Sequence, residues 1–476
     1  MEMLIDIGKI MIMPFEFDSI LELKIEKELN EHSTLYAYGV IKGGKEFTPV
    51  TDKIKDEKII CKNGGQVYFS GVLQSVKVTR SNDIYYLEIY AASNTILLDI
   101  TKHRRSFQDN NQNYKSIVEN VIGDKSIVKY NADAKTVDNI ILQYNETDWE
   151  FAKRLASHTN DVLIPITDDI PAFHFGVPGT EVAELKSSSY AISKDIDAFW
   201  RMKTEDKPLP IEAAVLYTVE TDLFVCELGK EIKLKCIDAD GEIEAYLHVC
   251  RVSLSLVDSA LTVVYTLCAQ EAICTPKVYN RAITGVALSG KVLKVENDNV
   301  KLHLDIDDKQ DEAAAHLFVY ATSYSAEGHT GWYVMPEKGD TVQLFFPDED
   351  EKHAYASSSL RQDNTAKTTD PLIKYWRTAF GKEIKMDEKE VLISSVDDKT
   401  YIRINMDTGI DIIASRPIKI TSEDDIGIDG KNDISIKSGR NIAMNAQGAI
   451  NLSCSGSSIT IDGNISLSGG IIRENG

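Results

Sequence analysis

Two glycine-rich stretches of this chain end in lysine, as phosphate-binding loops do. They span residues 39–45 and 285–291. A phosphate-binding loop also needs a Ser or Thr after the lysine to hold magnesium, and it joins a strand to a helix. Glu46 and Val292 stand at that position, and neither stretch leads into a helical pattern. We therefore expect neither stretch to bind a nucleotide.

The candidates for metal binding are also incomplete. Asp238 and Asp240 are spaced like calcium ligands, but Cys236 and Leu247 occupy the two ends of the loop, where oxygen ligands are required. A β-hairpin turn is the better account of this segment. The nine histidines are scattered, without the paired spacing of a zinc site. We therefore predict no catalytic residue, no metal ligand and no cofactor.

The most regular feature of the chain is a repeat that begins at residue 402 and runs to the end. Each repeat opens with two apolar residues separated by one residue. The spacing is eight residues from Ile402 to Ile450 and then loosens. Alternation on a period of two is typical of a strand with one buried face, and the Gly and Asn residues between the pairs favour sharp corners. Each repeat therefore predicts one strand and one corner of a β-solenoid or β-prism.

We call the apolar pairs of these repeats the octad row. Their predicted role is to form the core of the prism. The residues are Ile402, Ile404, Ile410, Ile412, Ile418, Ile420, Ile426, Ile428, Ile434, Ile436, Ile442, Met444, Ile450, Leu452, Ile459 and Ile461.

The repeats also bear on the oligomeric state. A single chain would need three repeats for each turn, so nine repeats would make about three rungs, the minimum for a stable solenoid. Three chains wound together would instead point every apolar pair at a shared axis. Each buried isoleucine would then contribute roughly 1.5–3 kcal/mol. With a rise of ~4.8 Å per repeat, the rod would be on the order of 40 Å long. We favour the intertwined trimer over the single-chain solenoid.

The amino-acid composition of the chain limits which partners the protein can bind and in which cellular compartment it can fold. The 476 residues are 43% hydrophobic and 26% charged, as in soluble proteins of two to four domains. A net charge of −22 repels nucleic acid, so we expect no nucleic-acid partner. The seven cysteines include no CxxC pair and suit buried thiols in a reducing cytosol. We expect no signal peptide, because the start lacks a basic segment, and no membrane-spanning helix.

Before the repeats, the pattern is mainly β with two short helices. Strand-like alternation fills the first hundred residues and residues 210–275, and residues 285–360 are compact enough for a small barrel. Helical spacing appears over residues 114–122 and again after a capping box of Thr147 and Glu150. Residues 361–395 are charged and irregular, which predicts a connector.

Two aromatic residues, Trp149 and Phe151, follow the capping box. They could line a ligand site. We expect them instead to be core side chains, the more common role of large aromatic residues on a short helix.

Three segments resemble the VgrG family of contractile injection systems and its relatives in extracellular injection particles and phage baseplates. Residues 143–155 are similar to the Y-x-E-[ST]-D-[WF]-x-F-x-x-R-L segment of the hub domain. Residues 331–342 resemble the P-E-x-G-D turn of its OB-fold. Residues 377–384 resemble the R-T-x-x-G-x-E-I segment that leads into the prism, with departures at Phe380 and Lys382. The order of the three segments, followed by the eight-residue repeats, is a more specific sign of the family than any one segment alone.

The resemblance implies a mainly β fold with four parts. These are a hub of two β-barrel subdomains with short helices (1–280), an OB-fold (281–360), a connector (361–395) and an intertwined trimeric triangular β-helix (396–476). It also implies a tip contact at the end of the chain, where a PAAR-type tip protein would cover Ile465, Leu467, Ile471 and Ile472.

The function implied by the resemblance is mechanical. The homotrimer would dock on the hexameric inner tube protein and on baseplate proteins, and it could carry effectors. Its spike would pierce a target membrane transiently. The protein would assemble in the bacterial cytoplasm without a signal peptide. Sheath contraction would then deliver it outside the cell or into the target cell.

A second class of function stays open: a trimeric phage-type tail fibre, or a β-helix protein that binds or cleaves polysaccharide. That function needs carboxylate pairs and aromatic residues along the prism. Tyr401 is the one aromatic residue from position 400 onward. Too few residues separate Leu360 from Arg377 to hold an inserted enzymatic domain. The sequence therefore favours a spike that is not an enzyme.

Overall fold

The structure is a computed structural model of the chain. It describes residues 3–4, 7–42, 58–179, 182–187, 189–202, 209–238, 241–326, 330–361, 369–396 and 399–461. The chain divides into two units, Met1–Asp363 and Asn364–Gly476, and each has its own fold. Within the described ranges, no helix is long and apolar enough to cross a membrane.

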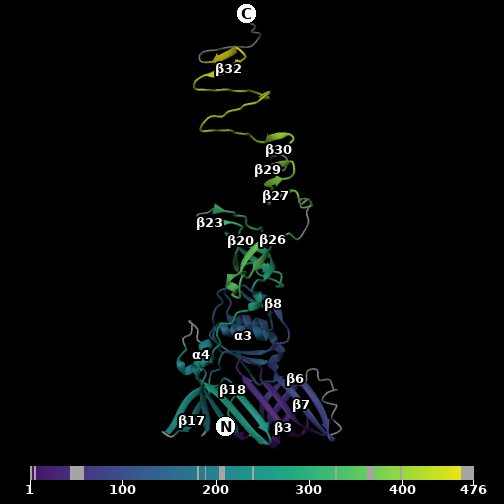
Figure 1. Ribbon diagram of the computed structural model, residues 1–476, viewed down its shortest axis with the longest axis vertical. Helices are drawn as coiled ribbons and strands as arrows, with labels where there is room; N and C mark the ends of the chain where they lie inside the picture. The colour runs from purple at the N-terminus through teal and green to yellow at the C-terminus, as the bar shows by residue number, and fades with distance from the viewer. Residues whose placement is uncertain are drawn as a thin grey trace. The chain divides into compact units, whose positions relative to one another are not determined.

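The first unit is built on one large sheet (Figure 1). Its strands are β2 (Ile10–Met13), β3 (Phe17–Glu28), β4 (Thr34–Ile41), β5 (Lys58–Asn63), β6 (Gln66–Ser81), β7 (Ile84–Ser93), β13 (Ala183–Ser187), β14 (Tyr190–Lys194), β15 (Val215–Thr221), β17 (Glu231–Asp238), β18 (Gly241–Val257) and β19 (Ala260–Cys268). Their order is β14-β15-β19-β18-β3-β4-β7-β6-β5-β2; in addition β17 pairs with β18, and β13 pairs with β17. Every second residue of β4 is buried, which is the pattern that period-two alternation predicts.

An antiparallel ladder between β3 and β18 joins the two halves of this sheet. It runs over paired residues from Glu28 opposite Arg251 to Glu22 opposite Val257. The two halves also share one apolar core, in which Leu35 of the first half and Tyr265 of the second are both fully buried. The two halves are thus paired through this ladder over a common core, and the expectation that each half forms a barrel subdomain stays a prediction.

A layer of helices and short strands packs around a second core. Its elements are β8 (His103–Phe107), α2 (Tyr114–Ile122), β9 (Ile127–Tyr130), β10 (Ile141–Glu146), α3 (Asp148–His158), β11 (Leu163–Pro165), β12 (Ala172–Phe175) and, separately, α4 (Ile196–Met202). The unit also contains the pair β1 (Met3–Leu4) and β16 (Leu223–Phe224). Its 3-10 turns are η1 (Ile7–Lys9), η2 (Asn94–Leu98), η3 (Gly123–Lys125), η4 (Ile211–Ala214), η5 (Gln270–Ala272), η6 (Arg281–Ile283) and η7 (Glu351–His353).

Both predicted helices are confirmed. The apolar residues of α2 are buried on one face, and the helix ends at Gly123, whose φ is 53°. At the start of α3, Thr147 Oγ1 accepts a hydrogen bond from the Glu150 N–H (3.0 Å), and the Glu150 carboxylate accepts one from the Thr147 N–H (2.9 Å). This is the expected capping box. A similar box at Asn113 begins α2 and was not predicted.

A five-stranded antiparallel sheet follows, made of β20 (Ala287–Glu296), β21 (Asn299–Leu304), β22 (Leu317–Val319), β25 (Thr341–Phe345) and β26 (Tyr355–Leu360). The strand order is β22-β21-β20-β25-β26. A parallel bridge between Tyr320 and Ala356 brings the two edge strands together, so the sheet closes into a barrel. Its interior is apolar and includes Val300, Leu344 and Phe346.

The second unit contains a five-stranded meander and a hairpin. The meander is β27 (Lys374–Arg377), β28 (Glu383–Met386), β29 (Glu390–Val396), β30 (Thr400–Asn405) and β31 (Gly409–Ile413); the hairpin is β32 (Ile450–Cys454) and β33 (Ser457–Ile461). We expected residues 361–395 to be irregular. That expectation is wrong for β27, β28 and β29, whose alternation is hidden among charged residues.

Candidate functional site

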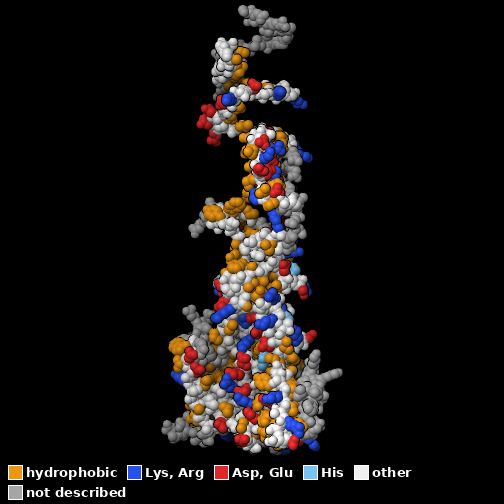
Figure 2. Space-filling model, turned by 45° about the vertical axis from the view of Figure 1, so that its right-hand side comes forward, with side chains coloured by type: hydrophobic (Ala, Val, Ile, Leu, Met, Phe, Trp, Pro, Cys, Tyr) orange, Lys and Arg blue, Asp and Glu red, His pale blue; other side chains and the backbone are white. Residues whose placement is uncertain are grey.

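The octad row is exposed along the single chain. Fourteen of its sixteen residues are exposed, with Ile420 the most exposed at 75% and Ile436 at 65%; Ile450 is half-buried. The side chain of Ile461 and the predicted tip residues Ile465, Leu467, Ile471 and Ile472 lie outside the described side chains. Soluble monomers rarely expose an apolar surface of this extent, so the row is a candidate interaction site. Figure 2 shows hydrophobic side chains at the surface of this part of the chain.

The first two repeats form the hairpin β30–β31. Ile402 lies opposite Ile412 and Ile404 lies opposite Ile410. Residues that face each other across a ladder point to the same side of the sheet, as do residues two apart on one strand. These four isoleucines therefore form one apolar face.

The same face continues across the whole meander. The register places Ile393 opposite Ile402 and Val391 opposite Ile404, and then Ile384 opposite Ile393. Trp376 on β27 lies opposite Ile384. We call this set the meander face: Trp376, Ile384, Met386, Val391, Ile393, Ile402, Ile404, Ile410 and Ile412. Its β27–β29 members were missed in the sequence, although their period-two spacing could have revealed them.

The opposite side of the meander is mixed: it holds Leu392, Tyr401 and Ile413 together with charged residues that pair with one another. Arg403 lies 3.3 Å from Glu390 and 3.8 Å from Asp411. Lys385 contacts Asp387 at 2.6 Å and Glu390 at 3.2 Å, and its hydrogen bond lowers the pKa of Asp387 to about 2. The meander thus has one face that carries paired charges and one apolar face, most of which the single chain leaves exposed.

The middle repeats differ from the first ones. Residues 414–449, all of them described, contain no strand. Figure 1 shows this part of the chain as straight lengths that reverse at corners. Each repeat was expected to form a strand, and in one chain these do not. A strand requires a hydrogen-bonding neighbour, and in the described part of the chain no segment forms a β-ladder with residues 414–449.

The structure also places the residues first considered for chemistry. Gly290 and Lys291 lie inside β20, and a Cβ on Gly39 in β4 would approach the Ser19 carbonyl oxygen to 2.3 Å. Neither stretch is therefore a phosphate loop in its described part; residues 43–45 lie outside the described residues. Asp238 pairs with Gly241 where β17 turns into β18, which confirms the hairpin. In the described part of the chain, no group of three or more His, Cys, Asp or Glu is placed to hold a metal ion.

The hub segment 143–155 has a structural role. Trp149 and Phe151 are buried in the helical core, as predicted. The buried Arg154 guanidinium donates to Glu146 at 2.7 and 2.9 Å and to Glu351 at 2.9 Å. Burial alone would lower the pKa of Arg154, but the two carboxylates raise it overall. Glu351 lies in η7, just before β26. The ion pair between Arg154 and Glu351 therefore links α3 to the five-stranded barrel.

His158, at the end of α3, is buried, and the contacts of its two ring nitrogens suit a neutral imidazole. Its Nδ1 lies 3.3 Å from the Tyr114 hydroxyl and its Nε2 lies 3.1 Å from the Val278 carbonyl oxygen. Burial, reinforced by the charge of Arg154, lowers its pKa to about 3. The folded protein therefore keeps His158 neutral at a pH where the unfolded chain protonates it.

This shift predicts a loss of stability in acid. Below the ordinary pKa of 6.5 the unfolded state binds a proton that the folded state does not, so the contribution of His158 to stability falls steadily between pH 6.5 and pH 3. Denaturant unfolding at pH 7, 6, 5 and 4 should show this decline. His158→Gln, which cannot titrate, should give a shallower decline. Equal slopes for the two proteins would contradict the prediction.

The comparisons with known proteins concern the family of the hub residues and the fold. Residues 48–160 match the family model of the phage tail baseplate hub (GPD). The chain resembles the E. coli c3393 protein at 14% identity, covering 74% of this chain and 100% of that one, with a TM-score of 0.52. That protein is a component of the type VI secretion system with structural similarity to the T4 bacteriophage tail proteins gp27 and gp5.

The likeness extends to the Francisella PdpA–VgrG complex. In its lidded form the match has 9% identity, covers 83% of this chain and 76% of that chain, and has a TM-score of 0.53. In its lidless form the match has 9% identity, covers 83% and 93%, and has a TM-score of 0.51. The chain has the fold of a VgrG-type spike protein. No curated protein sequence matches it.

The hub segment lies within the residues that the family model matches, whereas the repeats lie outside them. The family match includes residues 143–155, whose side chains hold α3 in place. The octad row and the meander face lie beyond the residues that the family model matches, and most of their described side chains are exposed.

Proposed function

We propose that the protein is a homotrimeric hub and spike of a contractile injection system. The observation that carries this proposal is the exposure of the octad row and of the meander face in a single chain. Three copies that turn these surfaces toward a common axis would bury them. They would also give the middle repeats the hydrogen-bonding neighbours that one chain lacks.

The proposed domains follow the order of the parts. Residues 1–280 form the hub, residues 281–360 the OB-fold and residues 396–476 the spike. The closed five-stranded barrel supports the OB-fold assignment. Residues 361–395 connect OB-fold and spike, and their strands begin the apolar face that the repeats continue.

The proposed role is structural and requires no chemistry. The hub docks on a hexameric inner tube protein and on baseplate proteins. The spike carries a PAAR-type tip protein at Ile465, Leu467, Ile471 and Ile472, and effectors can travel with it through the target membrane. Assembly takes place in the bacterial cytoplasm, and sheath contraction delivers the particle outside or into the target cell.

The mass of the purified protein in solution tests the trimer. We expect light scattering to give the mass of three chains for the full-length protein and of one chain after deletion of residues 396–476. The deletion removes the octad row, so the loss of trimer would assign assembly to it. A full-length monomer would favour a single-chain solenoid and would remove the physical basis of the spike. A trimer that survives the deletion would place the main contacts in the hub.

A further inference from the structure

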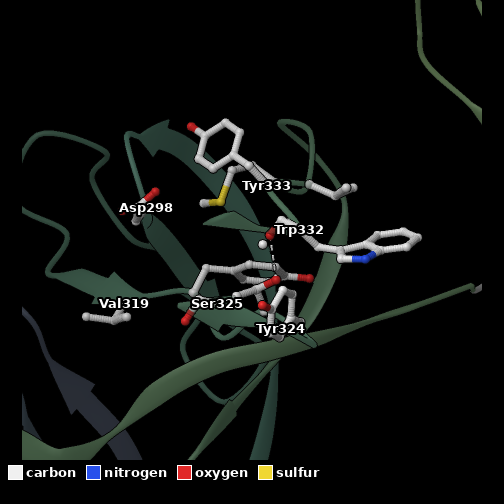
Figure 3. A pocket seen from close by; sticks show the side chains of 11 residues that line it. Asp298, Val319, Tyr324, Ser325, Trp332 and Tyr333 are labelled. Carbon is white, nitrogen blue, oxygen red and sulfur yellow. Dashed lines mark hydrogen bonds between the residues drawn. The ribbon is translucent and has the colours of Figure 1, made fainter. Parts of the chain in front are cut away.

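The five-stranded barrel carries a hollow of about 580 Å³ beside a short arm, β23 (Ser325–Ala326) paired with β24 (Thr330–Gly331). Figure 3 shows Tyr324, Trp332 and Tyr333 around this hollow. Its lining includes no cysteine and no histidine, and Asp298 is its one charged residue. Thiol groups gather instead in the hub.

A β-bulge in the hub brings two thiols together. The register between β18 and β19 shifts at Cys250, which is the extra residue of the bulge. The Cys250 thiol donates to the Thr266 carbonyl oxygen (3.2 Å), and the Cys268 thiol donates to Cys250 Sγ. Neither cysteine is in a disulfide. Two free thiols of neighbouring strands are therefore in direct contact.

A buried histidine lies beside this pair. His248 is directly opposite Cys268 in the ladder and is 5% exposed. Among the described residues, no hydrogen-bond partner reaches its buried Nδ1, which is rare for a buried polar atom. Burial lowers the pKa of His248, so the ring is neutral near pH 7. A neutral imidazole next to a thiol is a base that can accept the proton of that thiol.

The two thiols differ in reactivity. Cys250 is half-buried, whereas Cys268 is 2% exposed. The hydrogen bond from Cys268 lowers the pKa of Cys250 and raises the pKa of Cys268, so Cys250 is the one that ionises first. The thiolate is the form that attacks a disulfide. Burial raises the pKa of Cys61 and of Cys226 to about 12, which keeps those thiols unreactive.

We propose that Cys250 and Cys268 are a redox-active pair that closes to a disulfide when the protein meets an organic disulfide. The Cys250 thiolate attacks one sulfur of the oxidant, forms a mixed disulfide and releases the first thiolate. Cys268 then passes its proton to His248, attacks the Cys250 sulfur and releases the second thiolate. Two electrons and two protons thus pass from the protein to the oxidant, which becomes two thiols. The sulfur atoms must approach to about 2.05 Å, and the bulge can absorb this shift because the ladder is already interrupted there.

The pair would respond to a change of compartment, a role that rests on the proposed function. In a reducing cytosol the two thiols stay free, whereas disulfides persist outside the cell. Delivery would therefore add a covalent link between β18 and β19. Because β18 also pairs with β3, this link would lie beside the ladder that joins the two halves of the hub.

Oxidised glutathione tests the pair in the full-length protein. Cys454 is exposed and could link separate copies, so Cys454→Ser serves as the parent. The reduced parent is incubated with oxidised glutathione at mildly alkaline pH, free thiols are alkylated, and peptides are mapped by mass spectrometry. We expect most chains to lose two free thiols and to link Cys250 to Cys268. Fragmentation of the linked peptides places the link, because Cys236 shares a tryptic peptide with Cys250 and Cys274 shares one with Cys268.

Three further substitutions separate the roles. Cys274→Ser is the matched control, because Cys274 also lies near Cys268, and it should form the same link as the parent. Cys250→Ser should leave Cys268 reduced. His248→Gln should close the disulfide at least roughly tenfold more slowly and should accumulate glutathione on Cys250, since the second step loses its base. Protection of the buried Cys61 from alkylation verifies that each variant is folded.

Several results would overturn the proposed pair. These are a link between Cys268 and Cys274, glutathione that stays on Cys250 of the parent, and a parent that keeps all its thiols. An unchanged rate in His248→Gln would overturn the role of the histidine. Light scattering of the same samples keeps the two proposals apart. A trimer without the disulfide contradicts the pair alone, whereas a full-length monomer contradicts the proposed function.

Discussion

Replacing Ile436 with lysine is expected to convert the trimer into monomers. In the proposed spike, Ile436 of each chain points at the shared axis, so the substitution places three ammonium groups together in an apolar core. Each buried, unpaired charge costs several kcal/mol. In the single chain Ile436 is 65% exposed, so the substitution does not disturb the fold of the chain itself. Light scattering should show a fall from three chains to one.

Ser435→Lys is the matched control for this experiment. Ser435 lies between Ile434 and Ile436, and the alternation of side chains along an extended segment directs it to the opposite side. The same lysine at this position should stay in solvent and leave the trimer intact. Loss of the trimer in both variants would indicate a general effect of charge. A heat-resistant trimer of Ile436→Lys would contradict the shared core.

Replacing Arg154 with alanine is expected to cause the largest loss of stability in the first unit. Arg154 and Glu351 are both buried, and Glu146 is nearly so. Removing the guanidinium leaves two carboxylates close together without a counter-charge. Breaking a buried ion pair in this way typically costs about 3–5 kcal/mol. Denaturant unfolding, followed by the fluorescence of the four tryptophans, of which Trp149 is the buried one, should show the hub transition at a lower denaturant concentration.

Lys153→Ala is the control, because it removes a cation from the neighbouring position. Lys153 pairs with Glu31 at 2.6 Å, but both side chains are well exposed. An exposed pair contributes about 0–1 kcal/mol, so this variant should unfold close to the parent protein. Similar losses for Arg154→Ala and Lys153→Ala would contradict the role of the buried cluster.

Local patterns predicted the elements that are built from neighbouring residues. The helix of residues 114–122, the capping box of Thr147 and the hairpin at Asp238 depend on contacts within a few positions, and all three are confirmed. The β27–β29 members of the meander face were missed. Val391 and Ile393 alternate among charged residues such as Lys385 and Glu390, which lower the local hydrophobicity. The sequence does not reveal that these charges pair with one another on the opposite face.

Contacts between distant segments could not be predicted from local patterns. Nothing near Glu28 indicates that Arg251 will lie opposite it, and the continuity of the large sheet depends on that ladder. The link from Arg154 to Glu351 joins residues from two parts of the chain with separate cores. The sequence identified Arg154 through its motif, whereas its partner Glu351 had no recognisable pattern.

The ladder between β3 and β18 has a consequence for synthesis. More than 200 residues separate Glu28 from its partner Arg251. At a typical rate of synthesis the ribosome needs roughly ten to forty-five seconds to produce that length. During this interval one edge of β3 has no native partner, while several nascent chains can share one message. An unpaired edge is a template for another strand, so the hub is most vulnerable to misassembly before residue 251 has left the ribosome.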